Sequence, residues 1–548
     1  MMKKILPVIL SICLMLTGCD ISYVGMGIQD REAALQSPPP AAPAPMATDN
    51  YIPRFNSELN LSMRAPKTLN PLVNSDVTVD KVLRLIFEPL CELRENMRPA
   101  PNLLSKVEFS SDGMSAACTL REDVYWSDGV KMSSGDVQFS VNAINNDNGS
   151  DIYKSIVKDI TSVDIIDSSN FRVRFRVAQG GAAYSLCFPV IPRHFYSGEI
   201  RESSGTAFTP VGNGVYKLSE IKSIRELTLA SNENSFRNKP YIEQVRVFIM
   251  DDGETDLQAF DQNIIDAIDS SYMAFGKYSG SKDIITTAYD TNNYVFLGFN
   301  FSNAIFSDIM VRQAIAHSID KDKIMESIYL NNASKADSII NPSSYLYEHE
   351  LNDYKFDLNE AANLLFQAGC ADNDLDGVLD KEIAGFARAL KLTLLVNEEN
   401  AERIKIAQAI KTNLELLNFV VDIEVCDFES YMTRVESGDY DMFLGTLNLD
   451  ARPDFRFFLH SESVSEGSNY FNYKSDDLDV LIEIAEDARS ESELIAAMSA
   501  VQGYLAEDLP CISIAFVKRA LLSDAGIKGD KKPVIGNIFF NVEEWKIE

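Results

Sequence analysis

Side chains capable of acid–base or nucleophilic chemistry are numerous in this chain, but few stand at the spacing that an active site needs. The motifs H-E-x-x-H, G-x-S-x-G and G-x-x-x-x-G-K-[ST] do not occur. With 81 Asp and Glu residues, a catalytic carboxylate pair does not stand out. The histidines, which we expect to be surface or satisfied core residues, are His194, His317, His349 and His460. An enzyme is therefore the least favoured class of function, and we expect no cofactor.

One acidic segment has the alternating oxygen ligands of a calcium loop. Asp372, Asp374 and Asp376 precede Gly377, as at the start of such a loop. The twelfth position, however, is Ile383, where a calcium loop needs a bidentate glutamate. A polar turn is the favoured interpretation, and a structural calcium site is the alternative.

Composition narrows the class of protein. The chain of 548 residues is long enough for two or three domains with substantial cores. Its formal charge of −31 argues against nucleic acid, which requires a basic binding face. No apolar run after the N-terminus approaches the length of a membrane span. A soluble, acidic binding or catalytic body is the class that remains.

The start of the chain combines charge, an apolar run and a cysteine. Two lysines precede the run Ile5 to Leu16, which is too short to cross a bilayer as a helix. This order is typical of an export signal. Leu16-Thr17-Gly18-Cys19 resembles a bacterial lipobox, in which cleavage leaves Cys19 as the lipidated N-terminus. We expect a signal peptide over 1–18 and a lipid anchor at Cys19; a plain secretory signal is the alternative.

The segment after Cys19 and the remaining cysteines agree with an extracytoplasmic protein. Residues 19–50 are rich in Pro and Ala and lack apolar periodicity, which predicts an extended tether. Six further cysteines are widely and irregularly spaced, without a C-x-x-C pair or a zinc pattern. We expect most of them to be buried free thiols.

The elements that must position any site change in character along the chain. Up to about residue 288, short alternating segments predict strands; they include 58–63, 171–177, 226–230 and 245–249. Helical spacing then begins at 311–319, after Ser307 or Asp308. Asp357 predicts the N-cap of a helix that ends at Gly369.

Beyond that helix, strand and helix patterns alternate. The segments 390–396, 419–425 and 441–445 predict strands, and 406–417 predicts a helix between the first two. A strand–helix–strand–helix–strand order predicts an α/β unit with a mostly parallel sheet.

These segments, in this order, resemble the peptide-binding branch of the extracellular solute-binding proteins, family 5, that serve bacterial ABC importers. The resemblance covers about residues 59 to 520. The segments that carry it are Lys67-Thr68-Leu69-Asn70-Pro71, Ile86-Phe87-Glu88-Pro89-Leu90, Pro99 to Leu104, Ser111-Asp112-Gly113, Leu120 to Gly129, Ser134 to Ser140, Val211 to Tyr216, Ser307-Asp308 with Val311 to Ile315, and Ser318-Ile319-Asp320.

The resemblance implies a fold and a division into domains. The fold is a bilobed α/β protein of the periplasmic-binding-protein type (type II, cluster C), with two hinged lobes and an extra strand-rich domain. The implied divisions are lobe I over 51–91, 189–288 and 520–548, an inserted strand-rich domain over 92–188, and lobe II over 289–519.

The resemblance also implies a ligand site. In peptide binders of the family, strands pair with the peptide backbone, and an aspartate meets its α-ammonium group. In this chain the corresponding segment runs from Asp441 to Asp450. Asp450 is the implied ammonium partner, and Gly445 and Leu447 would offer backbone groups. Thr446 replaces the family's usual tryptophan, and a turn or helix-cap role for Asp450 is the alternative.

The expected function is that of a membrane-anchored, monomeric receptor that delivers short peptides to an ABC permease. A nickel chelate or an oligosaccharide is an alternative ligand on the same scaffold. Four histidines and two tryptophans are few for either of these. A receptor that senses peptides at the cell surface is a further alternative.

Overall fold

The computed structural model describes most of the chain, over residues 58–146, 149–178, 180–196, 209–271, 277–278, 280–452 and 454–548. The expected signal peptide, Cys19 and the tether lie outside the described residues. In the part of the chain that is described, no helix is long and apolar enough to cross a membrane.

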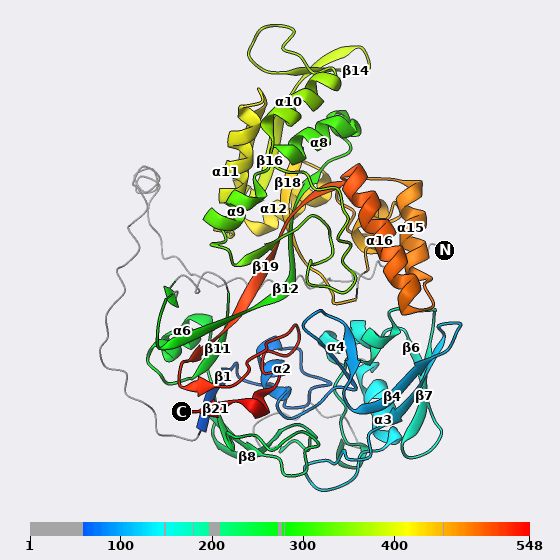
Figure 1. The fold of residues 1–548 in the computed structure, drawn as a ribbon, viewed down its shortest axis with the longest axis vertical. Helices are drawn as coiled ribbons and strands as arrows, with labels where there is room; N and C mark the ends of the chain where they lie inside the picture. Colours follow the sequence, from blue (N-terminus) through cyan, green and yellow to red (C-terminus); the bar gives the residue numbers. More distant parts are fainter. Residues whose placement is uncertain are drawn as a thin grey trace, which may run out of the picture.

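Two four-stranded sheets form the lower half of the molecule in Figure 1. The first has the order β1-β10-β9-β8, and its strands are β1 (Glu58–Met63), β8 (Tyr216–Ser223), β9 (Glu226–Ser231) and β10 (Gln244–Ile249). The second has the order β4-β5-β7-β6, and its strands are β4 (Leu104–Phe109), β5 (Ser115–Leu120), β6 (Ile160–Ile165) and β7 (Asn170–Phe175). Alternate side chains of β7 are buried, as its sequence predicts.

A seven-stranded sheet forms the upper half and reaches into the lower one. Its order is β11-β19-β12-β18-β16-β17, and β13 pairs with β19. Its strands are β11 (Ala267–Ser271), β12 (Ile284–Phe299), β13 (Ala333–Lys335), β16 (Lys391–Asn397), β17 (Val420–Cys426), β18 (Met442–Asn448) and β19 (Cys511–Asp524). Three two-stranded sheets complete the strands: β2 (Cys91–Leu93) with β3 (Pro99–Pro101), β14 (Asp380–Ile383) with β15 (Phe386–Ala389), and β20 (Ile527–Lys528) with β21 (Lys546–Ile547).

The sheet corrects one expectation about strand direction. β16 is parallel to β17 and to β18, as the strand–helix alternation predicts. The pairs of β12 with β18 and of β19 with β11, β12 and β13 are antiparallel. The sheet is therefore mixed, because strands from distant parts of the chain extend the local parallel unit.

The longer helices cover the sheets, and several begin where the sequence predicts. The α-helices are α2 (Val77–Leu83), α3 (Ser134–Ile144), α4 (Asp151–Val157), α5 (Arg193–Tyr196), α6 (Gly253–Asp261), α8 (Ile309–His317), α9 (Lys321–Ser327), α10 (Leu358–Gln367), α11 (Ala401–Glu415), α12 (Phe428–Ser437), α13 (Arg456–Leu459), α14 (Ser463–Glu466), α15 (Asp476–Glu486) and α16 (Glu491–Asp508). Asp357 accepts hydrogen bonds from the backbone N–H groups of Asn359 and Glu360, so the predicted N-cap is confirmed.

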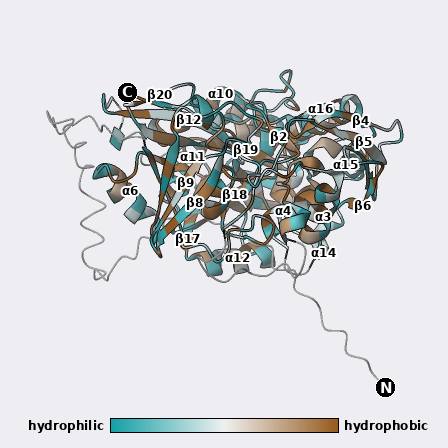
Figure 2. Cartoon of the chain, turned by 90° about the horizontal axis from the view of Figure 1, so that it is seen from below, coloured by the Kyte–Doolittle hydropathy of each residue, from teal (hydrophilic) through white to brown (hydrophobic). Residues whose placement is uncertain are grey.

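The two halves have separate cores. One apolar cluster joins both four-stranded sheets with Trp545 near the C-terminus, and two others fill the space around β16, β18 and α8 to α16. Figure 1 shows β12 and β19 running from one half into the other. In Figure 2 hydrophobic colour lies mainly inside the body and hydrophilic colour at its periphery. The predicted bilobed α/β fold is confirmed.

Candidate functional site

β18 ends at the boundary between the two halves and has a partly open edge. It pairs with β12 along its whole length, from Phe299 opposite Met442 to Asn293 opposite Asn448. Its pairing with β16 stops at Phe443. Beyond that residue, no described strand lies on the β16 side. The hydroxyl of Tyr431 donates to the carbonyl of Leu444 there at 2.9 Å, so an extended chain could add to the sheet only beside the residues that follow Leu444.

The two predicted backbone positions lie on this part of β18. Gly445 is buried, and a Cβ atom there would stand 2.4 Å from the ring of Phe296, so the packed ring excludes a side chain. Leu447 is half-buried and packs against the core around α15 and α16. The glycine therefore has a packing role that the sequence did not reveal.

Asp450 follows β18 and keeps its carboxyl group free of ion pairs with described residues. Loss of surrounding solvent raises the pKa of Asp450, and the positive charges of Lys158 and Arg452 partly oppose that rise. The residue as a whole is exposed, so water reaches at least part of it. An anion in such surroundings favours a cationic partner.

A bulge in β12 positions the chain before Asp450. The register of β12 against β19 shifts between Tyr289 and Asn293. Asn292, within the bulge, accepts a hydrogen bond from the backbone of Leu449 at 3.0 Å, and its side-chain amide donates to the carbonyl of Asp450 at 3.3 Å. Hydrogen bonds thus hold Leu449 and Asp450 beside the position where the register of β12 against β19 shifts.

A cavity of about 250 Å³ lies beside this segment. The lower half contributes Lys158, Asp159, Val177, Gly180 and Gly181 to its lining. The upper half contributes charged residues and an apolar floor from α15, α16 and Phe455; the charged ones are Arg452, Asp454, Glu486 and Asp487. The cavity is therefore shared by the two halves of the molecule.

Ion pairs cross from one half to the other around the cavity. Arg452 contacts Asp159 at 2.9 Å, and Lys158 contacts Asp454 at 3.4 Å. Sequence analysis missed these four residues, because the partners are 293 and 296 positions apart and have no local pattern. The nearness of Arg452 and Asp454 to Asp450 in the chain was the one available signal.

A second polar contact between the halves lies at the start of α16. Arg98 donates two hydrogen bonds to Glu491, at 2.8 and 2.6 Å. The backbone N–H of Tyr345 donates to the carbonyl of Asn96 at 3.1 Å. Since both charged side chains are substantially exposed, we expect the ion pair to contribute little free energy.

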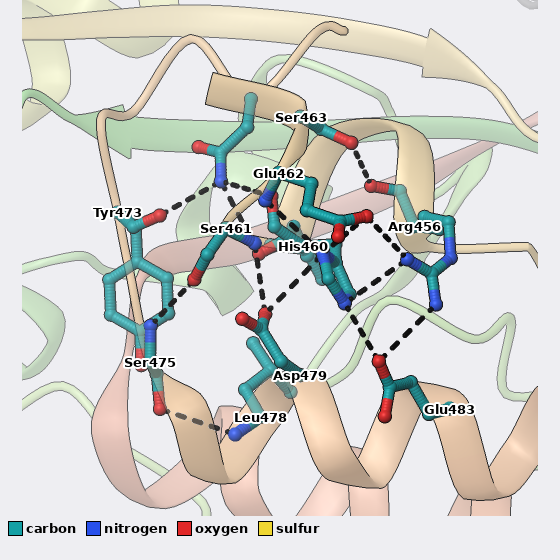
Figure 3. A network of polar contacts seen from close by, with 12 residues as sticks. Arg456, His460, Ser461, Glu462, Ser463, Tyr473, Ser475, Leu478, Asp479 and Glu483 are labelled. Carbon is teal, nitrogen blue, oxygen red and sulfur yellow. Dashed lines mark hydrogen bonds and ion pairs between the residues drawn. The ribbon is translucent and has the colours of Figure 1, made fainter. Parts of the chain in front are cut away.

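A polar network holds the chain that follows Asp454 (Figure 3). Arg456 donates to Glu486 at 2.8 Å, to Glu462 at 3.1 Å, and contacts the ring of His460 at 3.2 Å. The His460 ring is buried and accepts a hydrogen bond from the backbone N–H of Glu462. This confirms His460 as a satisfied core residue, and the network ties the loop to α15.

The remaining candidate residues lie away from this site. The six described cysteines are free thiols, as expected. The carboxylate oxygens of Asp372, Asp374 and Asp376 lie within 4.8 Å of one another. Asp372 accepts hydrogen bonds from the backbone of Asp376 and Gly377, which is the geometry of a polar turn.

Comparison with known proteins finds a family that matches the middle of the chain and relatives that cover most of its length. The family described as bacterial extracellular solute-binding proteins, family 5 middle, matches residues 98–469. The oligopeptide-binding protein AppA of Bacillus subtilis strain 168 is 22% identical over 499 residues, which are 88% of this chain and 90% of that protein.

Two solved structures extend the likeness to three dimensions. NikZ of Campylobacter jejuni, in complex with Ni(L-His), is 25% identical with a TM-score of 0.65, over 90% of this chain and 100% of that chain. AppA of Bacillus subtilis, in complex with a nonapeptide, is 20% identical with a TM-score of 0.61, over 90% of this chain and 99% of that chain. The second likeness concerns the fold alone.

Proposed function

The chain belongs to the bacterial extracellular solute-binding proteins of family 5, and on that premise we propose that it captures short peptides and delivers them to the permease of an ABC importer. The relative AppA is named for binding oligopeptides. The observation that carries the proposal is Asp450, which follows the end of β18 and whose carboxyl group forms no ion pair with a described residue. A peptide brings both groups that suit this place, an ammonium group and a backbone that extends a sheet.

The proposed binding mode divides affinity between these two contacts. Asp450 pairs with the α-ammonium group, and closure of the lobes over the peptide would remove solvent from this contact and strengthen the attraction. The backbone beside Gly445 and Leu447 pairs with the peptide backbone, which every peptide sequence provides. We therefore expect binding to require a free N-terminus more strictly than any one side chain.

Closure of the two lobes completes the proposed cycle. The bulge at Asn292 is the proposed hinge, because β12 and β19 pass there from one core to the other. The proposed divisions remain lobe I over 51–91, 189–288 and 520–548, the strand-rich domain over 92–188, and lobe II over 289–519. The cavity then lies where the strand-rich domain meets lobe II.

Location and partners complete the proposal. Cys19 is the proposed lipid anchor, with residues 20–50 as a tether that keeps the monomeric body near its permease. No turnover of the peptide is expected. A receptor that senses peptides would still produce its response after deletion of the importer genes, whereas a receptor that serves import alone would not.

The substitution Asp450→Asn tests the ligand contact. We expect free-amine tripeptides to lose about 2–5 kcal/mol of binding free energy, since one partner of a charge pair is removed. N-acetylated peptides, which lack the ammonium charge, should bind wild type and variant equally. Asp422→Asn, at an exposed position on β17, is the matched control. Calorimetry reports the affinities, and native mass spectrometry of gently purified protein reports any retained peptide, metal chelate or sugar.

Unchanged affinity of free-amine peptides in Asp450→Asn would remove this residue from the site. Absence of binding across a broad series of peptides of two to six residues would end the peptide assignment, although not the family membership. Release of product from labelled peptides would contradict a binding role without catalysis.

The pH dependence follows from the raised pKa of Asp450. Only the ionised carboxyl group pairs with an ammonium group, so affinity should fall as pH drops through that raised pKa, and Asp450→Asn should show no such fall. In the empty protein the sign is opposite. The folded state takes up the proton more readily than the unfolded chain, so this group's contribution to stability declines as pH rises through the same window.

A further inference from the structure

The cavity beside Asp450 is lined by charged residues and also by an apolar floor. The floor consists of core side chains, each at most 5% exposed: Phe455, Ile482, Ala485, Leu494, Met498 and Val501. They come from α15, α16 and the loop after β18, and belong to one apolar cluster. A ligand group that enters the cavity therefore meets hydrocarbon below it.

The charges that line the cavity are mostly paired with one another. Arg452 is paired with Asp159, Lys158 with Asp454, and Glu486 with Arg456. Asp487 is the remaining charged lining residue, and it is exposed to solvent. An anionic ligand side chain would have to break one of these pairs and a cationic one has only the exposed Asp487 as a free partner, whereas an apolar side chain needs neither.

The size of the cavity suits a large side chain. An apolar cavity of about 150 Å³ holds a benzene-sized group; this cavity, which has charged residues above its apolar floor, has about 250 Å³. Unfilled apolar volume forgoes contacts on one side of its lining, so an occupant of matching shape stabilises it. Leucine, methionine and phenylalanine side chains have the required size and chemistry.

The cavity is also close to the end of the peptide that we assign to Asp450. Arg452 and Asp454, which follow Asp450 closely in the chain, both line the cavity. A peptide whose ammonium group meets Asp450 therefore places its first residues beside the opening.

We propose that this cavity is a specificity pocket that takes a bulky apolar side chain from one of the first residues of the bound peptide. The proposal rests on the proposed function, because it takes Asp450 as the partner of the ammonium group. It adds a preference that backbone pairing alone does not supply. Peptides with leucine, methionine or phenylalanine near the N-terminus are the ligand class that it names.

A peptide series measures the preference directly. Trialanine is compared by calorimetry with tripeptides that carry Leu, Phe, Lys or Glu at position one, two or three. We expect Leu or Phe to bind tenfold or more tighter than Ala at one position among the first two. Lys and Glu at that same position should give no gain.

Filling the cavity should remove that preference and nothing else. In Ala485→Leu, added side-chain atoms occupy the floor, so the gain for Leu or Phe peptides should disappear while trialanine keeps its affinity. Ala496→Leu makes the same change at an exposed position of α16 and should leave the series unchanged. If Ala485→Leu does not fold, Met498→Ala enlarges the pocket instead and should shift the preference towards tryptophan.

The outcomes separate this inference from the function on which it rests. If wild type binds trialanine without any gain for apolar side chains, the specificity pocket is refuted and peptide binding stands. A preference for Lys or Glu, or an equal loss for all peptides in Ala485→Leu, also refutes it. If no peptide of two to six residues binds, the proposed function fails, and the inference fails with it.

Discussion

The upper and lower halves of the molecule meet in two regions that differ in burial and in the continuity of their strands. In the first, β12 and β19 run through the boundary as paired strands, and Asp269, on β11 beside β19, has a side chain that is 4% exposed. The second region surrounds the cavity, and none of the described strands crosses it. The side chains of Arg98 and Glu491, which form an ion pair there, are 55% and 38% exposed. We therefore expect the first region to hold the two halves together and the second to open and close.

In the first region, a buried carboxylate, Asp269, is paired with two cations. Asp269 contacts Lys81 at 2.5 Å and Arg519 at 3.0 Å, and the hydroxyl of Tyr289 donates to it at 2.9 Å. Burial by itself would raise the pKa of Asp269, but the two cations hold it below the usual value. Both carboxylate oxygens of buried Asp269 therefore have partners within the protein. The exposed charges around the cavity do not need such partners, because water solvates them.

The largest expected effect is the loss of Asp269. Asp269→Ala leaves two cations beside an apolar hole, and we expect the free energy of unfolding to fall by about 3 kcal/mol. Urea denaturation measures this change. Glu491→Ala removes a carboxylate from the second region and should cost less than about 1 kcal/mol. Equal losses in both variants would show that the two regions do not differ in this way.

A smaller effect, on peptide affinity, is expected from a substitution at Gly180, which packs against Ser490 of the other half. A Cβ atom on Gly180 would stand 2.5 Å from the carbonyl oxygen of Ser490, across the boundary. Gly180→Ala should therefore hold the lobes apart, lower peptide affinity about tenfold, which is about 1.4 kcal/mol, and leave the stability of the fold unchanged. Small-angle scattering should detect a more open molecule in the presence of peptide.

Gly503→Ala is the control for that substitution, because a Cβ atom at this position of α16 meets nothing within 4 Å. It should leave affinity unchanged and add stability, since alanine favours a helix over glycine. If Gly180→Ala closes on peptide as fully as wild type, the contact at Ser490 does not limit closure.

The smallest effect is expected for the exposed ion pair. Arg98→Gln should weaken peptide binding by less than about 1 kcal/mol, because solvent and salt already screen the contact with Glu491. The difference from wild type should shrink as salt is added, and calorimetry at two ionic strengths measures it. A loss that persists in high salt would assign the pair to the first region instead.

Local patterns predicted the elements well and their assembly only in part. The strands 390–396 and 419–425 and the helix capped by Asp357 agree with the structure, because alternation, helical spacing and capping are written within about ten residues. The mostly parallel sheet was wrong beyond β16, β17 and β18. Strands β12 and β19, which come from either side of that unit, complete it by antiparallel pairing.

The site shows the same division. Asp450, Gly445 and Leu447 were predicted from a resemblance, and the structure places them at the end of β18, although their roles as ligand contacts stay predictions. Lys158 and Asp159 had no signal, since they follow α4 and approach Arg452 and Asp454 only in the folded chain. The packing role of Gly445 likewise depends on Phe296, which lies on the neighbouring strand.

The sequence by itself determined the family, the acidic character, the expected anchor at Cys19 and most of the local elements, because each depends on residues close together in the chain. Only the tertiary structure decided that β12 and β19 join the lobes, that ion pairs nearly 300 residues apart border a cavity, and that an apolar floor lies beside Asp450. Those features arise from burial and charge pairing between distant segments, which no local pattern records.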